Sequence, residues 1–390
     1  MQLSNRITTL TPDASGGWAL YFKARAMVAA GERVTELTIG EHDVRTDPAI
    51  LDEMHRAAKA GHTGYAAIPG IAPLRRAVAE RVQATTGVAT GPQNVVITAG
   101  GQAALFAAHM AVCDPGDRAL FIDPYYATYP GTLRGAGAVP VAVPARAENA
   151  FQPDPGDIAA AAAQGAASLL VNSPNNPTGV IYSRATLEGI ARAAQTHDFR
   201  VISDEVYDSQ VWQGAHVSIR ALPGMAERTL VIGSMSKGHA MTGSRVGWIV
   251  GPEEAVGHLI NLSTHTTYGV AGFIQEAALF ALRQGPAFEA AVGEPFRRRR
   301  EIALRILGGQ NSVRLVPPQG AMYLMLDIRA TGLSGNAFAE RLLEERRIAV
   351  MPGESFGAAA AGHVRVAMTV EDAAFGAALK ELVAFAAALA

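Results

Sequence analysis

Between residues 94 and 251, short runs of β-branched and aliphatic residues alternate with longer stretches of helical periodicity. The short runs lie at 94–98, 118–123, 168–174, 199–205, 229–236 and 245–251, and the clearest helical stretches at 102–112 and 183–198. The runs are almost continuously apolar, as expected for strands that are covered on both faces. This alternation predicts an α/β fold, in which a large domain holds a mostly parallel sheet flanked by helices.

The pattern changes after residue 285. We expect a long charged helix at 289–307, another helix at 335–347, and strand-like sequence at 314–328 and 363–369. The chain should therefore form a large domain at 46–288 and a small α+β domain from 1–45 and 289–390. Four consecutive arginines, 297–300, fall on the first helix. Because consecutive helical residues point in different directions, a solvated face is favoured over an anion site.

The composition excludes several classes of protein. The formal net charge of the 390-residue chain is −2, which gives no reason to expect a nucleic-acid or anionic-membrane partner. The single cysteine, Cys113, should be a buried structural thiol and fits a reducing compartment. Neither a secretion signal nor an apolar run of about 18 residues is found, so we expect a soluble cytoplasmic protein.

Chemically useful residues follow the predicted strands, where ligands of open α/β sheets collect. Gly100 and Gly101 end a strand just before a helix begins at Gln102, an arrangement that suits a phosphate group, although an ordinary tight turn would give the same residues. The segment lacks the GxGxxG pattern, which disfavours a dinucleotide. Tyr126, in the segment DPYYATYPG, either packs in the core or stacks on a flat ring.

Charged residues complete this set. Asp204 ends an apolar strand, where a carboxylate requires either a helix-capping role or a cationic partner. Lys237 and Arg245 lie in SMSKGHAMTGSRVGW; a buried lysine readily becomes a neutral nucleophile, and arginine binds phosphate in a fork. Arg365 lies between apolar neighbours and should have a carboxylate partner, from the protein or from a substrate. Together these groups match pyridoxal phosphate, and no metal site is indicated.

With these motifs the sequence resembles the class I/II aminotransferases, which are pyridoxal-phosphate enzymes of fold type I. The resemblance runs from VTELTIGEHD to GHVRVAMT, and its most specific blocks are 234–248, 172–179 and 203–207. The segment GIAPLR at 70–75 also matches the family pattern. Within the family, SKGHAMTG, HVSIRALPGMAERT and DIRATGLSGNAFAERLL are most similar to bacterial arginine–pyruvate transaminases.

The resemblance implies a role for each matching residue that would meet the cofactor ring. Lys237 would form the Schiff base with the cofactor aldehyde and then move the substrate proton. Asp204 would pair with the ring nitrogen, and Tyr126 would stack on the ring. Tyr207 and Asn176 would hydrogen-bond the ring oxygen. The resemblance also places the phosphate against Gly101, Gln102, Ser234, Ser236 and Arg245.

Arg365, assisted by the backbone of Gly40, would bind the α-carboxylate of the substrate. Tyr65 resembles the tyrosine that reaches the phosphate of a neighbouring subunit, which implies a homodimer. The substrates would be an amino acid and a 2-oxo acid such as pyruvate. Arginine is the first expected donor, followed by an aliphatic or aromatic amino acid, and by position Glu41 and Asp43 are the candidates to bind its guanidinium.

Three positions depart from the family pattern, namely His42, His239 and Ser244. They leave the chemistry unchanged and put the substrate preference in doubt, and at the first two we expect structural histidines whose ring nitrogens are satisfied by hydrogen bonds. A lyase, decarboxylase or cyclopropane-forming synthase on the same fold is the main alternative. A non-catalytic regulator would need a DNA-binding element, and the enzyme-like region begins almost at the start of this sequence.

Overall fold

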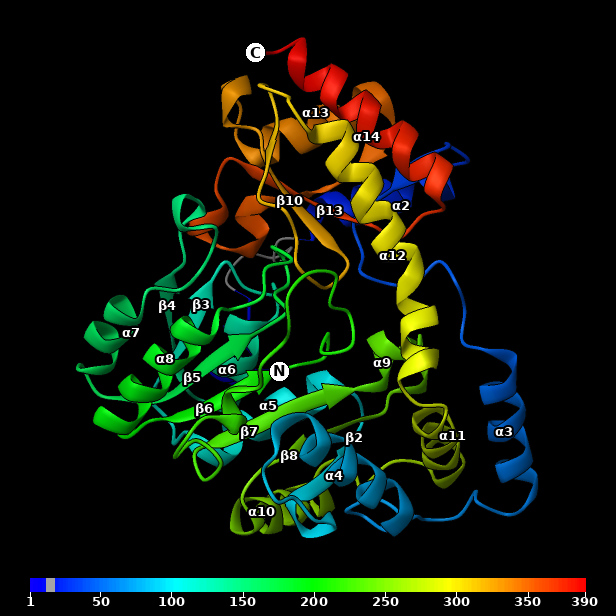
Figure 1. The fold of residues 1–390 in the computed structure, drawn as a ribbon, viewed down its shortest axis with the longest axis vertical. Coiled ribbons are helices and arrows are strands. Elements are labelled where there is room, and N and C mark those ends of the chain that lie inside the picture. The colour runs from blue at the N-terminus through cyan, green and yellow to red at the C-terminus, as the bar shows by residue number, and fades with distance from the viewer. Residues whose placement is uncertain (12–17) are drawn as a thin grey trace.

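The computed structural model describes residues 1–11 and 18–390, and its largest sheet has seven strands (Figure 1). In sheet order these are β2 (Val95–Thr98), β8 (Gly247–Val250), β7 (Thr229–Ser234), β6 (Arg200–Asp204), β5 (Ala166–Asn172), β3 (Arg118–Asp123) and β4 (Val139–Pro144). All neighbours are parallel except β8, which is antiparallel to both β2 and β7. The prediction of a mostly parallel sheet is confirmed.

The edge strand β4 was not among the predicted strands. Its sequence, VPVAVP, contains Pro140 and Pro144, and proline cannot donate a hydrogen bond to a neighbouring strand. At the edge β4 pairs only with β3, so one side of its backbone needs no partner strand. The two prolines make this segment look unlike a strand in the sequence, and they are tolerated because β4 lies at the edge of the sheet.

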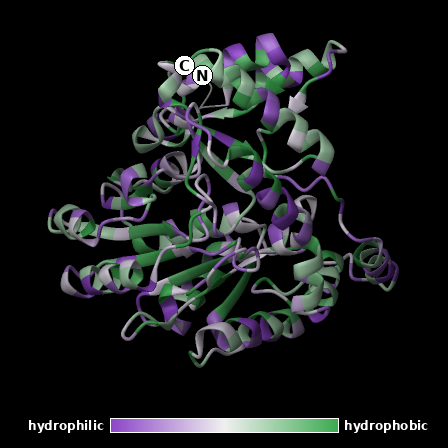
Figure 2. Cartoon of the chain, turned by 45° about the horizontal axis from the view of Figure 1, so that its top comes forward, coloured by the Kyte–Doolittle hydropathy of each residue, from purple (hydrophilic) through white to green (hydrophobic). Residues whose placement is uncertain are grey.

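Helices cover both faces of the sheet, as its sequence requires. Along β3, Leu120 and Ile122 pack into one buried cluster, whereas Phe121 packs into another on the opposite face. The strands are accordingly the most uniformly apolar elements in Figure 2. The flanking helices are α4 (Ala72–Thr86), α5 (Gly101–Val112), α6 (Tyr129–Ala136), α7 (Pro155–Ala162), α8 (Arg184–Thr196), α10 (Glu253–Thr264) and α11 (Gly272–Arg283), and α3 (Pro48–Lys59) packs on the outside of α11.

A smaller antiparallel sheet of four strands lies above the first in Figure 1. Its strands, in order, are β12 (Met351–Pro352), β13 (His363–Ala367), β10 (Tyr323–Asp327) and β9 (Arg314–Leu315). Beside it, β1 (Thr35–Glu36) pairs with β11 (Ile348–Ala349), so residues near the start of the chain join its last third. The helices here are α2 (Ala19–Ala29), α13 (Gly335–Arg346) and α14 (Asp372–Ala387), whereas α1 (Asn5–Thr8) contacts α6 beside the large sheet. Domain boundaries at 46 and 288 stay a prediction.

The helix α12 (Pro286–Leu307) corrects one expectation about the four arginines. Arg297 and Arg298 are exposed, but Arg299 and Arg300 are only 3% and 6% exposed. Arg299 bonds Asp43 at 2.6 Å and Asp372 at 2.9 Å, while Arg300 donates to the carbonyl of residue 318. The helix extends from the large sheet to the small one, as Figure 1 shows, so elements cover more than one of its faces. The predicted solvated face is therefore wrong for two of the four.

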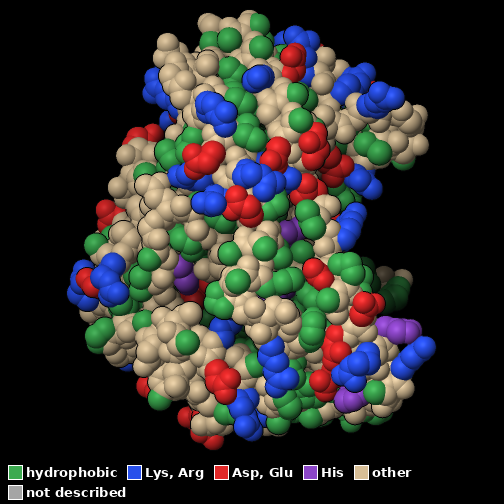
Figure 3. Space-filling view, turned by 45° about the vertical axis from the view of Figure 1, so that its right-hand side comes forward, with side chains coloured by type: hydrophobic (Ala, Val, Ile, Leu, Met, Phe, Trp, Pro, Cys, Tyr) green, Lys and Arg blue, Asp and Glu red, His purple; other side chains and the backbone are tan. Residues whose placement is uncertain are grey.

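The other general expectations concern Cys113 and the surface. Cys113 is buried, and its Sγ lies 3.3 Å from the Ser168 hydroxyl, as expected for a structural thiol. On the face where α12 lies, acidic and basic side chains are intermingled (Figure 3). Within residues 1–11 and 18–390, no helix combines the length and apolar character needed to cross a membrane.

Candidate active site

A cavity of about 210 Å3 lies beyond the carboxyl ends of β5, β6 and β7. Tyr65 and the two candidate acids, Glu41 and Asp43, do not line it, but all other predicted site residues do, namely Gly40, Gly101, Gln102, Tyr126, Asn176, Asp204, Tyr207, Ser234, Ser236, Lys237, Arg245 and Arg365. Arg365 comes from β13 of the small sheet and Gly40 from the segment after β1. The fold therefore gathers residues more than 300 positions apart around one cavity.

One end of the cavity has the features of an anion site. Helix α5 begins at Gly101, and the first N–H groups of a helix have no acceptor within the helix. Gly100 has φ +84°, and a Cβ atom there would lie 2.6 Å from a guanidinium nitrogen of Arg245. The Ser234 hydroxyl accepts from the N–H of Ser236 at 3.1 Å. Glycine is thus needed for the guanidinium to approach this helix end.

Asp204 ends β6 inside the cavity and is 4% exposed. Its carboxylate accepts a hydrogen bond from the Tyr129 hydroxyl at 2.6 Å and a longer one from the N–H of Val206 at 3.4 Å. Burial raises its pKa from 3.8 to about 6, although the Tyr129 bond opposes the change. No basic side chain of the described residues forms a salt bridge with it, so its charge lacks a cationic partner.

Lys237 lies on the short helix α9 (Met235–Gly238), directly after β7. Its amine donates a hydrogen bond to the carbonyl of Gly40 and lies 5.9 Å from the centre of the Tyr207 ring. The carbonyl of Lys237 accepts from the Gln210 side chain at 3.3 Å. The amine is therefore held at the cavity wall by the backbone carbonyl of the segment that follows β1.

Arg365 is 1% exposed and lies between two aromatic rings, with its guanidinium carbon 4.5 Å from the centre of Tyr323 and 4.3 Å from that of Phe356. It donates to the Asn176 side chain at 2.9 Å and to the carbonyl of Thr38. Its Nε atom is buried without a partner, and no carboxylate of the described residues pairs with it. A substrate carboxylate is therefore the alternative that the geometry favours.

Comparison with known proteins identifies the family. The sequence profile of the family described as "Aminotransferase class I and II" matches residues 32–382. Arginine–pyruvate transaminase AruH of Pseudomonas aeruginosa is 40% identical over 370 residues, which cover 95% of this chain and 94% of that protein. This chain belongs to the class I/II aminotransferases.

Other aminotransferases resemble the chain over similar lengths. The aspartate/prephenate aminotransferase of Thermus thermophilus is 37% identical, covering 95% of each chain. The structure of Thermus thermophilus aspartate aminotransferase with maleate has a TM-score of 0.92 and 36% identity, covering 99% of this chain and 100% of that one. The chain is accordingly a pyridoxal-phosphate-dependent transaminase, which uses an amino acid and a 2-oxo acid as substrates.

The cavity fits this aminotransferase cofactor on structural grounds. The Asp204 carboxylate lacks a cation, and a protonated pyridine nitrogen would supply one. At the other end, free helix N–H groups and Arg245 provide the donors that a phosphate group requires. The half-buried Tyr126 supplies an aromatic face between these two ends of the cavity.

Two tyrosines of the aminotransferase site were not predicted. The Tyr129 hydroxyl bonds Asp204, and the Tyr323 hydroxyl lies 2.9 Å from that of Tyr207 and 3.5 Å from the Asn176 amide. Tyr129 follows Tyr126 by three residues, so its position in the same segment was an available signal. Tyr323 lies on β10, and nothing in its local sequence indicates that it meets the large sheet.

The positions that depart from the family pattern lie behind the cavity. His42 is 5% exposed and packs edge-on against Phe296, and burial, followed by the charge of Lys237, lowers its pKa to about 4. His239 is 2% exposed, and burial lowers its pKa to about 3. Neither ring has a hydrogen-bond partner among the described residues, so these are buried neutral histidines, and the expectation that their ring nitrogens are satisfied is wrong. Ser244 is partly buried beside Arg245.

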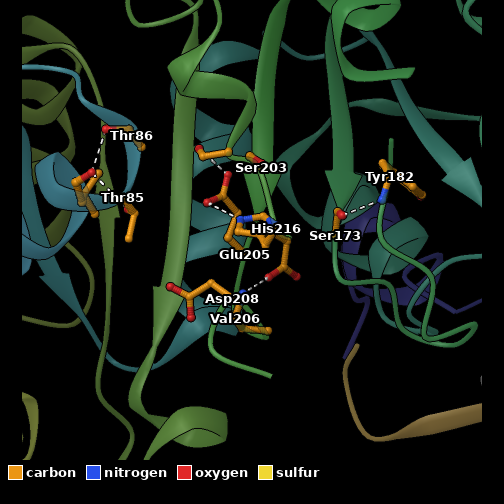
Figure 4. Close-up of polar contacts among 12 residues, drawn as sticks. Thr85, Thr86, Ser173, Tyr182, Ser203, Glu205, Val206, Asp208 and His216 are labelled. Carbon is orange, nitrogen blue, oxygen red and sulfur yellow. Dashed lines mark hydrogen bonds and ion pairs between the residues drawn. The ribbon is translucent and has the colours of Figure 1, made fainter. Parts of the chain in front are cut away.

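A polar cluster lies immediately beside Asp204 in the sequence. The Glu205 carboxylate is 7% exposed and accepts hydrogen bonds at 2.7 Å from the hydroxyls of Ser203 and Ser218. His216 approaches its other oxygen at 3.2 Å, as Figure 4 shows. Burial opposes protonation of His216, but the bond to Glu205 outweighs it and raises the pKa of the imidazole. The cluster fastens the segment after Tyr207 to β6.

Proposed function

We propose that this enzyme moves the amino group of an L-amino acid, with arginine as the preferred donor, to pyruvate at the cavity described above. One observation carries the assignment of the site. An amine, a carboxylate without a cation and a guanidinium without a carboxylate line the same cavity, and they are supplied by Lys237, Asp204 and Arg365. The 40% identity to an arginine–pyruvate transaminase supports the choice of donor and acceptor.

The cavity would bind the cofactor along its length. Gly101, Gln102, Ser234, Ser236 and Arg245 would hold the phosphate, and Tyr126 would cover one face of the ring. Asp204 would hold the proton of the ring nitrogen, because an ionised partner offsets the cost of burying the carboxylate. Tyr207 and Asn176 would donate to the ring oxygen. When bound, pyridoxal phosphate supplies an aldehyde for imine formation and a ring that accepts electrons from the substrate α-carbon.

Lys237 would be both the covalent anchor and the base. When its Nζ atom is not engaged as the anchor, the neutral amine would accept the α-proton of the substrate and later give that proton up again. The Gly40 carbonyl, which accepts from Nζ, would fix the direction of the amine. Proton transfer on one face of the ring would then need no other base.

Arg365 would bind the α-carboxylate of both substrates. The rings of Tyr323 and Phe356 limit its movement, and the Asn176 and Thr38 oxygens occupy two of its donors. Charge-assisted hydrogen bonds contribute roughly 1.5–3 kcal/mol each. A substrate without the carboxylate would leave this guanidinium unpaired, so selection for amino and 2-oxo acids would follow.

Recognition of a cationic donor would fall to Glu41 rather than Asp43. Both carboxylate oxygens of Asp43 bond Arg299, at 2.9 and 2.6 Å. Glu41 follows Gly40 and accepts at 3.1 Å from Thr242, which lines the cavity. Its side chain is 52% exposed, and its only ion pair among the described residues is a long one of 3.8 Å to Arg45. A guanidinium entering from the solvent side could therefore reach it.

A homodimer would complete the phosphate end. Tyr65 does not line the cavity of its own chain, is 92% exposed, and pairs with the half-exposed Tyr268 at 5.1 Å. Two aromatic side chains on one exposed patch are typical of an interface. We expect Tyr65 to reach the phosphate of the neighbouring subunit, and cross-linking between Cys variants of Tyr65 and Arg245 would detect that contact.

The donor assignment is tested with a panel of amino acids, each supplied with pyruvate or 2-oxoglutarate. Arginine with pyruvate should give the highest kcat/KM, and aspartate with 2-oxoglutarate as the best pair would contradict the proposal. A transaminase stops after one turnover without a 2-oxo acid, whereas continued product formation would indicate a lyase.

The site assignment is tested by borohydride reduction of the cofactor-loaded enzyme. The peptide that contains Lys237 should carry the label, and Lys237→Ala should abolish both labelling and turnover. Lys380→Ala, at an exposed position on α14, is the matched control and should label and turn over normally. Turnover by Lys237→Ala would refute the assignment.

A further inference from the structure

The segment after Tyr207 and the segment that carries Lys237 are packed tightly against each other. The Gln210 amide donates to the Lys237 carbonyl at 3.3 Å. A Cβ atom at Gly238 would lie 2.7 Å from the Ser209 hydroxyl, so no larger residue fits there without movement. A shift of the backbone that follows Tyr207 would therefore also shift the backbone at Lys237 and Gly238.

One guanidinium connects both segments to the rest of the large sheet. Arg81, on α4, donates at 2.9 Å to Asp208, the residue after Tyr207, and at 2.6 Å to Glu289 on α12. Its side chain is 22% exposed, and that of Glu289 is 7% exposed. Burial opposes the charge of Arg81, but the two carboxylates raise its pKa further above its usual range. It therefore stays charged and holds both acids at once.

Glu289 also packs against the lysine segment. Its Oε1 atom lies 3.4 Å from Nε2 of His239, which follows Lys237 by two residues, and because this ring is neutral the contact is neither an ion pair nor a hydrogen bond. The His239 ring also stacks on Phe288 with its centre 5.9 Å away. Arg81 is thus linked on one side to the neighbour of Tyr207 and on the other to the end of α9.

We propose that Arg81 is a positioning residue that sets the placement of the Lys237 amine relative to the Tyr207 hydroxyl. The inference rests on the proposed roles of these two residues. Arg81 itself does not line the cavity, so it acts through Asp208 and Glu289. Without it, two partly buried carboxylates would face each other without a cation, and the segments that they hold would separate. A lysine carries the charge but lacks the planar fork that reaches both acids.

The test compares Arg81→Ala and Arg81→Lys with Arg76→Ala, at an exposed position on the same helix. A displacement of about 1 Å between reacting groups can lower a rate by roughly a hundredfold, so Arg81→Ala should lower kcat about ten- to a hundredfold with KM changed less than about threefold. The pH at which the absorbance band of the bound cofactor changes should also shift, because in their proposed roles the amine and the hydroxyl would both contact the chromophore. Arg81→Lys should recover part of both effects, and Arg76→Ala should match the wild type.

Two results would overturn the inference. In the first, Arg81→Ala has the same kcat and the same pH titration of the cofactor absorbance band as Arg76→Ala. In the second, Arg81→Ala is less stable to urea, but the absorbance titration of its folded fraction is unchanged. If Arg81→Ala does not fold, Asp208→Asn replaces it, since it removes one acid at nearly constant volume and should shift the same absorbance titration; an unshifted titration also refutes the inference. Failure of borohydride to label Lys237 would instead refute the proposed function itself.

Discussion

Replacement of Asp204 by asparagine should stabilise the cofactor-free enzyme and destabilise its complex with the cofactor. In the cofactor-free protein the buried carboxylate has a hydroxyl and an N–H group as donors, but no cation. Asparagine has nearly the same shape, and its oxygen can accept the bond from Tyr129. The substitution therefore removes a charge without leaving a cavity.

The size of the effect follows from the pKa of Asp204, which is raised from 3.8 to about 6. Each pKa unit corresponds to 1.36 kcal/mol, so ionisation of Asp204 costs the folded protein about 3 kcal/mol. Because the pKa of the folded state is the higher one, the cost is absent below pH 3.8 and complete above about pH 6. The Asp204→Asn enzyme should thus gain up to about 3 kcal/mol at pH 8 and lose this advantage as the pH falls towards 4.

Urea unfolding of the cofactor-free proteins at several values of pH measures this difference. Asp52→Asn, which neutralises an exposed acid on α3, is the control and should show little change. Titration with pyridoxal phosphate should show weaker binding by Asp204→Asn, together with a large loss of turnover. Equal stability of the wild type and Asp204→Asn at every pH would refute the argument that an unpaired charge is buried there.

Three further substitutions test other contacts. Tyr323→Phe removes the hydroxyl next to Tyr207, and loss of one hydrogen bond of about 1 kcal/mol should lower kcat/KM about fivefold in steady-state assays. Arg299→Met leaves Asp43 without its ion-pair partner, while Asp372 keeps Arg298, and should cost about 3 kcal/mol in urea unfolding, whereas a loss below about 1 kcal/mol would contradict the importance of this ion pair. His216→Gln breaks the bond to Glu205. Because the pKa of His216 is raised in the folded state, the loss of stability should be greatest below pH 6.5 and should decrease as the pH rises above that value. A loss that does not depend on pH would exclude a charged imidazole.

Local sequence was sufficient to predict most of the large sheet and the residues around the cavity. The strands that end at Asn172, Asp204 and Ser234 are apolar runs that stop at polar residues, and parallel strands bring such ends to one edge. The resemblance to the family added the role expected of each residue. Those roles, and the reach of Tyr65 into a second subunit, remain predictions.

Contacts between distant segments could not be predicted. The burial of Arg299 depends on acids 256 residues before and 73 residues after it, and a run of arginines carries no sign of them. The same holds for Tyr323, which lies on an apolar strand of the small sheet yet bonds Tyr207. The position of Asp43 in the sequence favours substrate recognition, but both of its carboxylate oxygens accept hydrogen bonds from the distant Arg299.

The long helix α12 links movements of the large sheet to movements of the small sheet. Glu289, near its start, accepts a hydrogen bond from Arg81, which also bonds Asp208, and Arg299 bonds Asp43 in the loop that begins at Gly40. These residues are separated by about 15 Å at the usual helical rise. A tilt of the rod by a few degrees would move one attachment by about 1 Å relative to the other. A ligand that displaces the loop would therefore also move the Lys237 amine through α12, in addition to any direct contact with the amine in the cavity.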